Sequence, residues 1–299
     1  MSLSMKDVKE LRERTGAGVL DCKKALDETD GDIEAAIDYL REKGMSEAAE
    51  KSGRVAAEGL VNVLINDDRN EGLIVEVNSE TDFVAKNERF QDLVTNISKH
   101  IMQSNVEDVE KLNEEKWFED ESKTVDTIIK EAIAGIGENI NLRRYKKIET
   151  DGFLYGYIHL GGKIGVLAEF DGEKTEEHLK TAKNICMHIA ASNPEYLDRD
   201  SVDEAIVNKE KKIIKKQLEN EGKPEHILDQ IVEGKINKFY NQICLLEQDY
   251  IRDTDLQVQE VLEDSDISIN QFVRYELGEG IEKKEEDFAE EVMSEVNKN

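Results

Sequence analysis

The sequence predicts an α+β fold with two similar subdomains, each built from antiparallel strands and amphipathic helices. A hairpin pattern followed by a helical pattern occurs twice, at residues 59–102 and at residues 153–191. Weak repetition of this kind indicates two related units side by side. Helical patterns without strands lie outside these units, three short ones in residues 5–44 and two long ones in residues 202–240. We therefore expect a helical module before the core and a protruding helical hairpin after the second hairpin-and-helix unit.

The start of the chain has the apolar spacing of three short helices. A turn at Thr15-Gly16-Ala17-Gly18 separates the first two, and Asp30-Gly31-Asp32 separates the second from the third. The glycines of the first turn do not form a phosphate-binding loop, because no Lys-Ser/Thr pair follows them and no strand precedes them. Residues 45–54 are small, polar and charged, which predicts a linker or an extension of the third helix.

The first hairpin-and-helix unit follows. Short apolar runs at residues 59–65 and 72–77 predict two strands joined by a turn at residues 66–70. Apolar residues then recur at helical spacing between residues 90 and 101, which predicts an amphipathic helix. Residues 105–123 are strongly acidic and weakly periodic, and we expect a peripheral helical excursion there, pinned by its two aromatic rings.

The second unit is preceded by a helix at residues 125–133, which two glycines close, and by a strand at residues 139–148. Runs at residues 153–160 and 163–170 flank Gly161-Gly162, which is typical of a hairpin. Apolar residues between 179 and 189 then predict the matching helix.

Two long charged helical patterns come next, at residues 202–218 and from Pro224 to Phe239. Helices with this many charged residues cannot be buried on all sides in a large core. The pattern therefore predicts a protruding antiparallel helical hairpin. Beyond it, Thr254 is predicted to cap a short helix, and residues 272–277 to form a strand. The tail at residues 279–299 has the spacing of an acidic amphipathic helix that docks on another surface; its apolar positions are Phe288, Val292 and Val296.

The joint between the first hairpin and its helix is the stretch Asn78-Ser79-Glu80-Thr81-Asp82-Phe83-Val84-Ala85-Lys86-Asn87, polar except for Phe83 and Val84. Phe83 and Phe90 lie seven residues apart, so Phe83 would share the buried face if the helix began early. If Asn87 caps the helix instead, the helix begins later and Phe83 projects from the turn. Spacing favours burial without deciding the matter. An aromatic ring at such a turn either joins its own core or anchors a partner.

Composition excludes several classes of function. A formal charge of -28 disfavours a general nucleic-acid binder, since phosphate binding needs a positive surface. The five lysines in residues 209–216 are most simply a solvated helix face. No apolar run is long enough to span a membrane and no signal-peptide pattern begins the chain, so we expect a cytoplasmic protein. Cys22, Cys186 and Cys244 are isolated and odd in number, and we expect buried free thiols.

Residues that could carry enzyme chemistry are not arranged for it. The five histidines have no metal-ligand spacing with one another or with cysteine, and no serine lies in a nucleophile-elbow pattern. His188 falls near the apolar side of its helix, where a structural histidine with satisfied hydrogen bonds is expected. We predict no cofactor, no metal and no catalytic residues.

Four ordered motifs resemble those of bacterial elongation factor Ts, the nucleotide exchange factor for elongation factor Tu. The first is Thr81-Asp82-Phe83-Val84-Ala85-Lys86 after Glu76-Val77-Asn78. The others are Leu11-Arg12-Glu13-Arg14-Thr15-Gly16-Ala17-Gly18, Gly137-Glu138-Asn139-Ile140-Asn141-Leu142-Arg143-Arg144 and Gly278-Glu279-Gly280-Ile281-Glu282-Lys283. Four motifs in the family's order, over nearly the whole chain, are far more specific than any one alone.

The resemblance implies a division of the chain and a set of contacts. The implied parts are a ubiquitin-associated-like three-helix domain at 1–54, subdomain N at 55–143, subdomain C at 144–192 and 241–278, a helical hairpin at 193–240 inserted into subdomain C, and a C-terminal module at 279–299. It implies that Thr81, Asp82, Phe83 and Val84 dislodge Mg²⁺ from the partner. The implied partner contacts are Arg12, Val19, Leu20, Lys23 and His159, although an ordinary exposed turn residue describes His159 equally well.

The function implied is guanine-nucleotide exchange on elongation factor Tu, with no direct contact to nucleic acid or membrane and with self-association through the hairpin as a homodimer. Two rivals stay open at this point. One is a scaffold whose three-helix module recruits a protein without altering nucleotide affinity, and the other is a small-molecule enzyme that uses the glycine-rich tip at Gly161-Gly162. A GDP-release assay separates the first from an exchange factor, and nucleotide or metal binding by the isolated chain would support the second.

Overall fold

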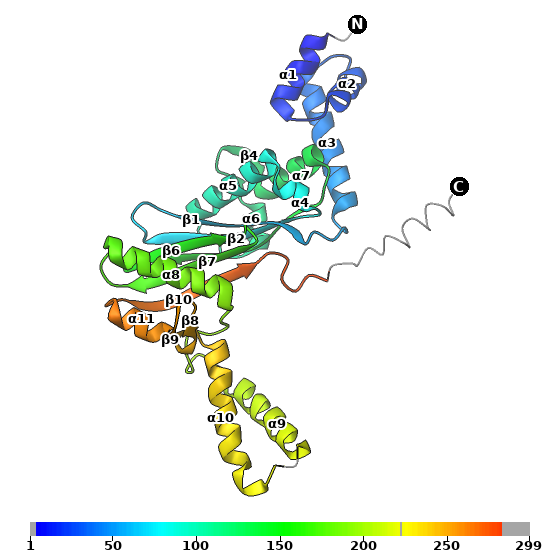
Figure 1. Cartoon of the computed structure of the whole chain (residues 1–299). Coiled ribbons are helices and arrows are strands. Elements are labelled where there is room, and N and C mark those ends of the chain that lie inside the picture. Colours follow the sequence, from blue (N-terminus) through cyan, green and yellow to red (C-terminus); the bar gives the residue numbers. More distant parts are fainter. Residues whose placement is uncertain (1–3, 222, 283–299) are drawn as a thin grey trace. The chain divides into compact units, whose positions relative to one another are not determined.

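A computed structural model describes residues 4–221 and 223–282, and the chain in it divides into two compact units. The first unit contains the chain up to Asn62, residues 75–145 and the chain from Glu276 onward. The second contains residues 63–74 and 146–275. The fold is a mixture of helices and antiparallel strands (Figure 1), as the α+β prediction requires. The predicted helix at residues 288–296 lies outside the described residues.

The first unit begins with the three predicted helices, which are α1 Met5–Thr15, α2 Val19–Glu28 and α3 Ile33–Lys51. Each break has a physical cause. Gly16 ends α1 in the left-handed conformation, with φ of 69°, and the Asp32 side chain accepts from the Ala35 amide at the start of α3. The buried core of the module includes Leu11, Cys22 and Leu26. Residues 45–51 continue α3, so this stretch is an extension of the helix and not a linker.

The first predicted hairpin with its following helix, at residues 59–102, is confirmed. Its strands β1 Glu58–Ile65 and β2 Glu71–Ser79 form a sheet with β5 Ile140–Glu149, in the order β1-β2-β5. The helices are α4 Asp82–Ala85, α5 Glu88–Gln103, α6 Val109–Glu114 and α7 Val125–Ile136, and a short hairpin of β3 Lys116–Trp117 and β4 Asp120–Thr124 precedes α7. The central strand β2 lies between β1 and β5 and is buried from Gly72 to Ser79.

The second predicted hairpin with its following helix, at residues 153–191, is confirmed too. Strands β6 Phe153–His159 and β7 Ile164–Asp171 are antiparallel, from the pair Phe153–Phe170 to the pair His159–Ile164, and β10 Ser268–Glu276 joins the other side of β7. The remaining elements are α8 Glu176–Ser192, the short helix Leu245–Glu247, β8 Asp249–Tyr250, β9 Asp253–Gln257 and α11 Val258–Asp264. Gly161 and Gly162 form the turn with positive φ.

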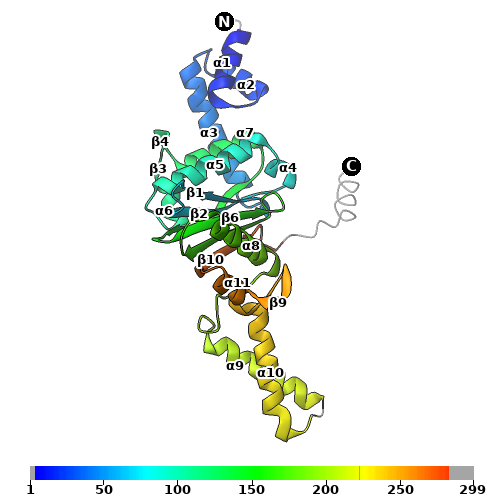
Figure 2. The same cartoon turned by 60° about the vertical axis from the view of Figure 1, so that its left-hand side comes forward.

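The internal repetition extends further than the sequence pattern indicates (Figures 1 and 2). Both copies run through a hairpin, a helix, a short two-stranded hairpin, a second helix and a third strand that pairs with the second strand of the first hairpin. The short hairpins share one irregular register, with Lys116–Thr124 and Trp117–Asp120 in one copy and Asp249–Gln257 and Tyr250–Asp253 in the other. Because such a bulged register is specific, its recurrence supports a duplicated architecture.

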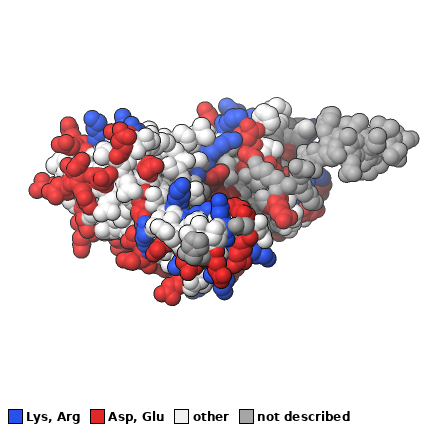
Figure 3. All heavy atoms as spheres, turned by 60° about the horizontal axis from the view of Figure 1, so that its bottom comes forward, with Lys and Arg blue, Asp and Glu red and all other residues white. Residues whose placement is uncertain are grey.

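The helical hairpin consists of α9 Glu204–Asn220 and α10 Glu225–Ile243, with Pro224 at the predicted helix start. It has a core of its own, which includes Val207, Ile214, Leu218 and Leu228. The five lysines of residues 209–216 are exposed, as predicted. On the face shown in Figure 3, acidic side chains dominate and basic ones are scattered among them. In the part of the chain that the structure describes, no helix has the length and apolar character needed to cross a membrane.

Two local predictions are wrong. Thr254 does not cap a helix: it lies in β9, which pairs with β8, and α11 begins only at Val258 with Gln257 as its N-cap. Residues 105–123 are only partly helical, since β3 and β4 follow the six-residue α6. In both places cross-strand pairing overrides local helical signals, although Trp117 is buried as expected.

Candidate functional site

The turn between β2 and α5 holds the residues singled out by the sequence, and two helix caps shape it. Thr81 caps the single turn α4, with its hydroxyl 3.4 Å from the Val84 amide. Asn87 caps α5 by accepting from the Arg89 amide at 2.9 Å. The chain therefore starts a helix, stops, and starts again within seven residues. Of the two alternatives left open by the spacing, the Asn87 cap is the one adopted.

Phe83 is exposed, so the burial favoured by its spacing from Phe90 is wrong. Its exposed fraction is 79%, whereas the neighbouring Val84 and Ala85 are 8% and 9% exposed. The reason is the Asn87 cap, which takes Phe83 out of the register of α5. Lys86 donates to Asp82 at 2.7 Å, and its ammonium lies 5.7 Å from the centroid of the Phe83 ring. The turn thus presents an aromatic ring beside a close charge pair.

Two carboxylates tie this turn to the residues that follow α7. Both oxygens of Glu138 accept from Thr81, one from its amide at 2.9 Å and one from its hydroxyl at 2.7 Å. In return Glu80 accepts from the Asn139 amide at 2.6 Å. We call these four residues (Glu80, Thr81, Glu138 and Asn139) the reciprocal clamp. It connects the first of the four motifs to the third.

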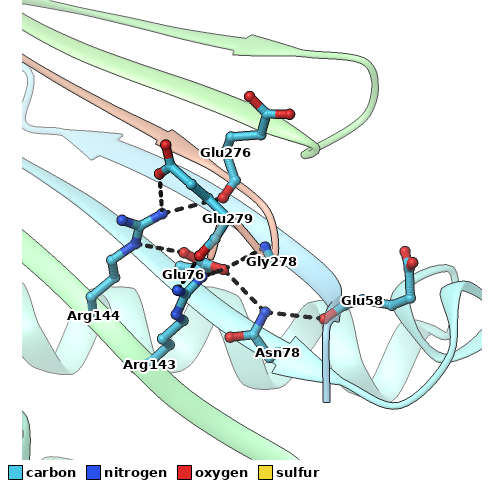
Figure 4. Close-up of polar contacts among 8 residues, drawn as sticks. All are labelled: Glu58, Glu76, Asn78, Arg143, Arg144, Glu276, Gly278 and Glu279. Atoms are coloured by element: carbon cyan, nitrogen blue, oxygen red, sulfur yellow. Dashed lines mark hydrogen bonds and ion pairs between the residues drawn. The ribbon is translucent and has the colours of Figure 1, made fainter. Parts of the chain in front are cut away.

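A second polar cluster, shown in Figure 4, connects strand β2 to the motif that begins at Gly278. The carboxylate of Glu76 is fully buried and accepts from Arg143 at 2.9 Å, Arg144 at 2.6 Å and the Gly278 amide at 2.8 Å. Arg143 and Arg144 also donate to the backbone carbonyls of Glu279 and Glu276. Burial would raise the pKa of Glu76, but the Gly278 and arginine hydrogen bonds outweigh it, and the pKa lies below its ordinary value.

The remaining motif, in the three-helix module, reaches the same region through Arg89. The guanidinium of Arg89 donates to the Gly16 carbonyl at 2.9 Å, at the end of α1. The module also packs closely on α7, since a Cβ on Gly44 would lie only 2.9 Å from the Cβ of Ala134. The other three motifs, far apart in the chain, therefore contact the Thr81–Val84 turn itself, the strand β2 before it or the helix α5 after it, within the first unit.

Comparison with known proteins agrees with this convergence. A family model described as Elongation factor TS matches residues 80–279, about two thirds of the chain. The Elongation factor Ts of Halothermothrix orenii is 64% identical over 298 residues, which is 100% of both chains. Those of Clostridium botulinum and Clostridium novyi are 52% and 49% identical over 303 residues, 99% of each chain. The chain belongs to the elongation factor Ts family. It is thereby an elongation factor of protein biosynthesis.

The other residues that the elongation factor Ts resemblance implies as contacts lie in two places. Arg12, Val19, Leu20 and Lys23 are exposed on the three-helix module, Leu20 with 82% of its surface in solvent. His159 belongs to the second unit, at the end of β6, where its Nδ1 lies 3.0 Å from the Tyr157 hydroxyl. It is half-buried and precedes the turn instead of forming it.

Sequence reasoning found the turn but missed the residues that hold it. Glu138 lies 57 residues from Thr81, and Arg89 lies 73 residues from Gly16. No periodicity links positions so far apart. Glu138 and Gly16 belong to motifs of the elongation factor Ts resemblance, which is the signal that could have found them, whereas Arg89 lies outside those motifs.

The histidine and the three cysteines that the sequence analysis considered in this elongation factor are buried. His188 is buried, with Nε2 2.9 Å from Gln248 and Nδ1 accepting from the Ile251 amide at 3.2 Å, which confirms the expected satisfied histidine. The three cysteines are buried free thiols, and burial raises the pKa of Cys244 to about 11. Among residues 4–221 and 223–282, no group of three His, Cys, Asp or Glu side chains is placed to hold a metal ion.

Proposed function

We propose that this chain is the guanine-nucleotide exchange factor for elongation factor Tu and acts in the cytoplasm during translation elongation. An exchange factor makes and breaks no covalent bond. It binds the nucleotide-free GTPase more tightly than the nucleotide-bound form, so by linkage it weakens nucleotide binding by the same factor. A coupling free energy of about 4 kcal/mol would weaken the affinity for nucleotide about a thousandfold.

The exposed Phe83 is the observation that carries this proposal. An exposed phenylalanine on a well-packed turn is poorly explained by folding alone, because the fold gains nothing from leaving the ring in water. Aromatic side chains at protein interfaces, by contrast, are frequent anchors. Val84 beside it is buried and fixes the turn to the protein. The ring is therefore presented on a turn that is itself packed in place.

The duplicated architecture supports the same conclusion. Eight residues, 80–87, separate β2 from α5, whereas four, 172–175, separate the equivalent strand β7 from α8. The additional length corresponds to α4, which carries Phe83. Since the second copy makes the same connection without these residues, they are not needed to build the fold. An insertion that the architecture does not need is a natural place for function.

In the proposed mechanism, Phe83 wedges between side chains of the GTPase, and Asp82 with it disturbs the shell that orients the partner's Mg²⁺. Loss of the ion removes the charge that neutralises the nucleotide phosphates. GDP then leaves, and GTP can enter. Thr81 shapes the turn by capping α4, and Val84 anchors it.

We propose further contacts outside the turn. The three-helix module, which we propose as a domain at 1–54, would extend the binding surface through Arg12, Val19, Leu20 and Lys23. His159 would contact a different domain of the partner, and the C-terminal module at 279–299 would bind the GTPase. The helical hairpin would mediate homodimerisation. Neither nucleic acid nor membrane takes part.

The proposal is tested by following release of fluorescently labelled GDP from elongation factor Tu. We expect the chain to accelerate release, and Phe83→Ala to reduce this acceleration by at least tenfold, since one buried aromatic anchor contributes about 2 kcal/mol or more. Ile251→Ala is a matched control, because it also removes an exposed apolar side chain, here 50% exposed in the turn between β8 and β9. A folded Phe83→Ala variant with unchanged acceleration would refute the wedge, and no acceleration by the native chain would refute the function.

A further inference from the structure

The reciprocal clamp determines how the Phe83 turn is held. α4 spans four residues, too few to persist in water without support from outside. Its own backbone supplies little, since the Lys86 amide donates to Phe83 at 3.2 Å and the Asn87 amide to Val84 at 2.9 Å. Burial of Val84 and hydrogen bonds from Ser79 to the Thr81 carbonyl and from Gln91 to the Ala85 carbonyl help to hold it. The clamp adds a restraint at the N-terminal end, where Glu138 fixes the amide and the hydroxyl of Thr81 together. The conformation of α4 therefore depends on a residue outside the turn.

The end of α7 aims Glu138 at this position. Gly137 ends α7 in the left-handed conformation, with φ of 91°, and its amide donates to Ile133. A Cβ there would meet nothing within 4 Å, so glycine is required for its φ and not for space. The chain turns sharply at Gly137, and the next side chain lies against Thr81. Asn139, 8% exposed, then anchors the segment by donating to the Arg54 carbonyl at 2.8 Å.

Among the described residues, the second copy of the architecture joins the equivalent segments without a hydrogen bond between a carboxylate and the strand-to-helix connection. There the strand-to-helix connection begins at Gly172, and a Cβ on it would lie 2.8 Å from the Cγ2 of Ile267, in the segment between α11 and β10. That closure is steric and apolar. The fold thus joins these two segments with or without hydrogen-bonding carboxylates, and the carboxylates accompany the copy that carries α4.

We propose that Glu138 is a positioning residue for nucleotide exchange: its carboxylate orients Thr81, and through Thr81 it presents the Phe83 ring to the partner. Glu138 acts through the turn and does not itself contact the GTPase. This inference rests on the proposed function for its effect on exchange, but its effect on the turn is a property of the isolated chain.

Three variants test the proposal. Glu138→Ala removes both hydrogen bonds to Thr81. Glu138→Gln is the matched control: its amide oxygen can accept from the Thr81 amide while its NH₂ group donates to the Thr81 hydroxyl oxygen, so both bonds persist without the charge. Phe83→Ala removes the ring that Glu138 is proposed to orient. Thermal unfolding of each variant identifies any that lose the fold.

Two measurements give the outcome. In the isolated chain, hydrogen exchange at the amides of residues 81–85 should accelerate about tenfold in Glu138→Ala and stay near native in Glu138→Gln. In the GDP-release assay, Glu138→Ala should reduce acceleration about tenfold and Glu138→Gln less than threefold. Combining Glu138→Ala with Phe83→Ala should be no worse than Phe83→Ala alone, because the two changes act through one ring.

Each alternative outcome overturns a different statement. Additive losses in the double variant would mean that Glu138 acts independently of Phe83, and equal losses in Glu138→Gln and Glu138→Ala would mean that its charge acts on the partner directly. Unchanged hydrogen exchange in Glu138→Ala would show that the clamp does not hold the turn. If the native chain failed to accelerate GDP release while hydrogen exchange behaved as stated, the proposed function would fail and the clamp would stand.

Discussion

Neutralising Glu76 should destabilise the first unit by about 2 to 3 kcal/mol. The change Glu76→Gln keeps the size of the side chain but removes the charge and turns one acceptor oxygen into a donor group. Glu76 is fully buried and binds two arginines, and hydrogen bonds to charged groups contribute about 1.5–3 kcal/mol each. We expect a loss below the 3–5 kcal/mol typical of a broken buried ion pair, because the side chains of Arg143 and Arg144 retain 23% and 30% exposure and can recover some hydration.

The assay is urea unfolding followed by the fluorescence of Trp117, the single tryptophan of the sequence, which is 4% exposed in the first unit. A matched control in the same unit is Glu13→Gln, which removes a carboxylate that is 68% exposed and lies 3.6 Å from Lys9. Such a surface pair contributes at most about 1 kcal/mol. A loss for Glu76→Gln no larger than that of the control would refute the view that the buried carboxylate organises this cluster.

Two further predictions concern other parts of the chain. Burial lowers the pKa of His100, which is 4% exposed and stacks on Trp117 at 5.0 Å, although Glu115 opposes the shift. The folded state therefore keeps its full stability above the ordinary histidine pKa of 6.5. As the pH falls below that value, the free energy of unfolding decreases by at most about 1.4 kcal/mol per pH unit. His100→Gln should flatten the dependence of the Trp117-monitored stability between pH 5 and 7. An equal slope in native and His100→Gln proteins would contradict the assignment. Replacing residues 204–241 with a short Gly-Ser linker should halve the mass measured by light scattering if the hairpin holds a dimer, and an unchanged mass in a folded variant would exclude that interface.

The sequence was sufficient for elements whose cause is local. Gly16 and Asp32 delimit the first helices through left-handed φ and side-chain capping, and the Gly161-Gly162 turn fixes the second hairpin. The sequence-based prediction failed at Thr254. Threonine is a common helix cap, but Thr254 lies in β9, whose partner strand β8 could not be identified from the sequence. The difference is physical, since a cap depends on neighbours within four residues whereas a strand depends on a partner elsewhere.

The candidate site shows the same division. Asn87 is a strong helix cap, and recognising its priority over the Phe83–Phe90 spacing would have predicted the exposed ring. Periodicity could not identify Glu138 as the partner of Thr81, because the two residues lie 57 positions apart and meet only across the fold.

The two copies of the architecture also differ at equivalent buried histidines, and this difference has a consequence for stability. His188 has both ring nitrogens hydrogen-bonded, to Gln248 and to the Ile251 amide. At the corresponding place His100 faces Glu115, with its Nε2 3.4 Å from the carboxylate, and neither ring nitrogen has a hydrogen-bond partner among the described residues. A neutral glutamine matches a neutral imidazole at any physiological pH, whereas a carboxylate favours its protonation. Carboxylates thus occupy two polar positions, Glu115 and Glu138, in the copy that carries α4. Because these charged contacts stand where the second copy has neutral ones, we expect the unfolding of the first copy to depend on pH more steeply than that of the second copy.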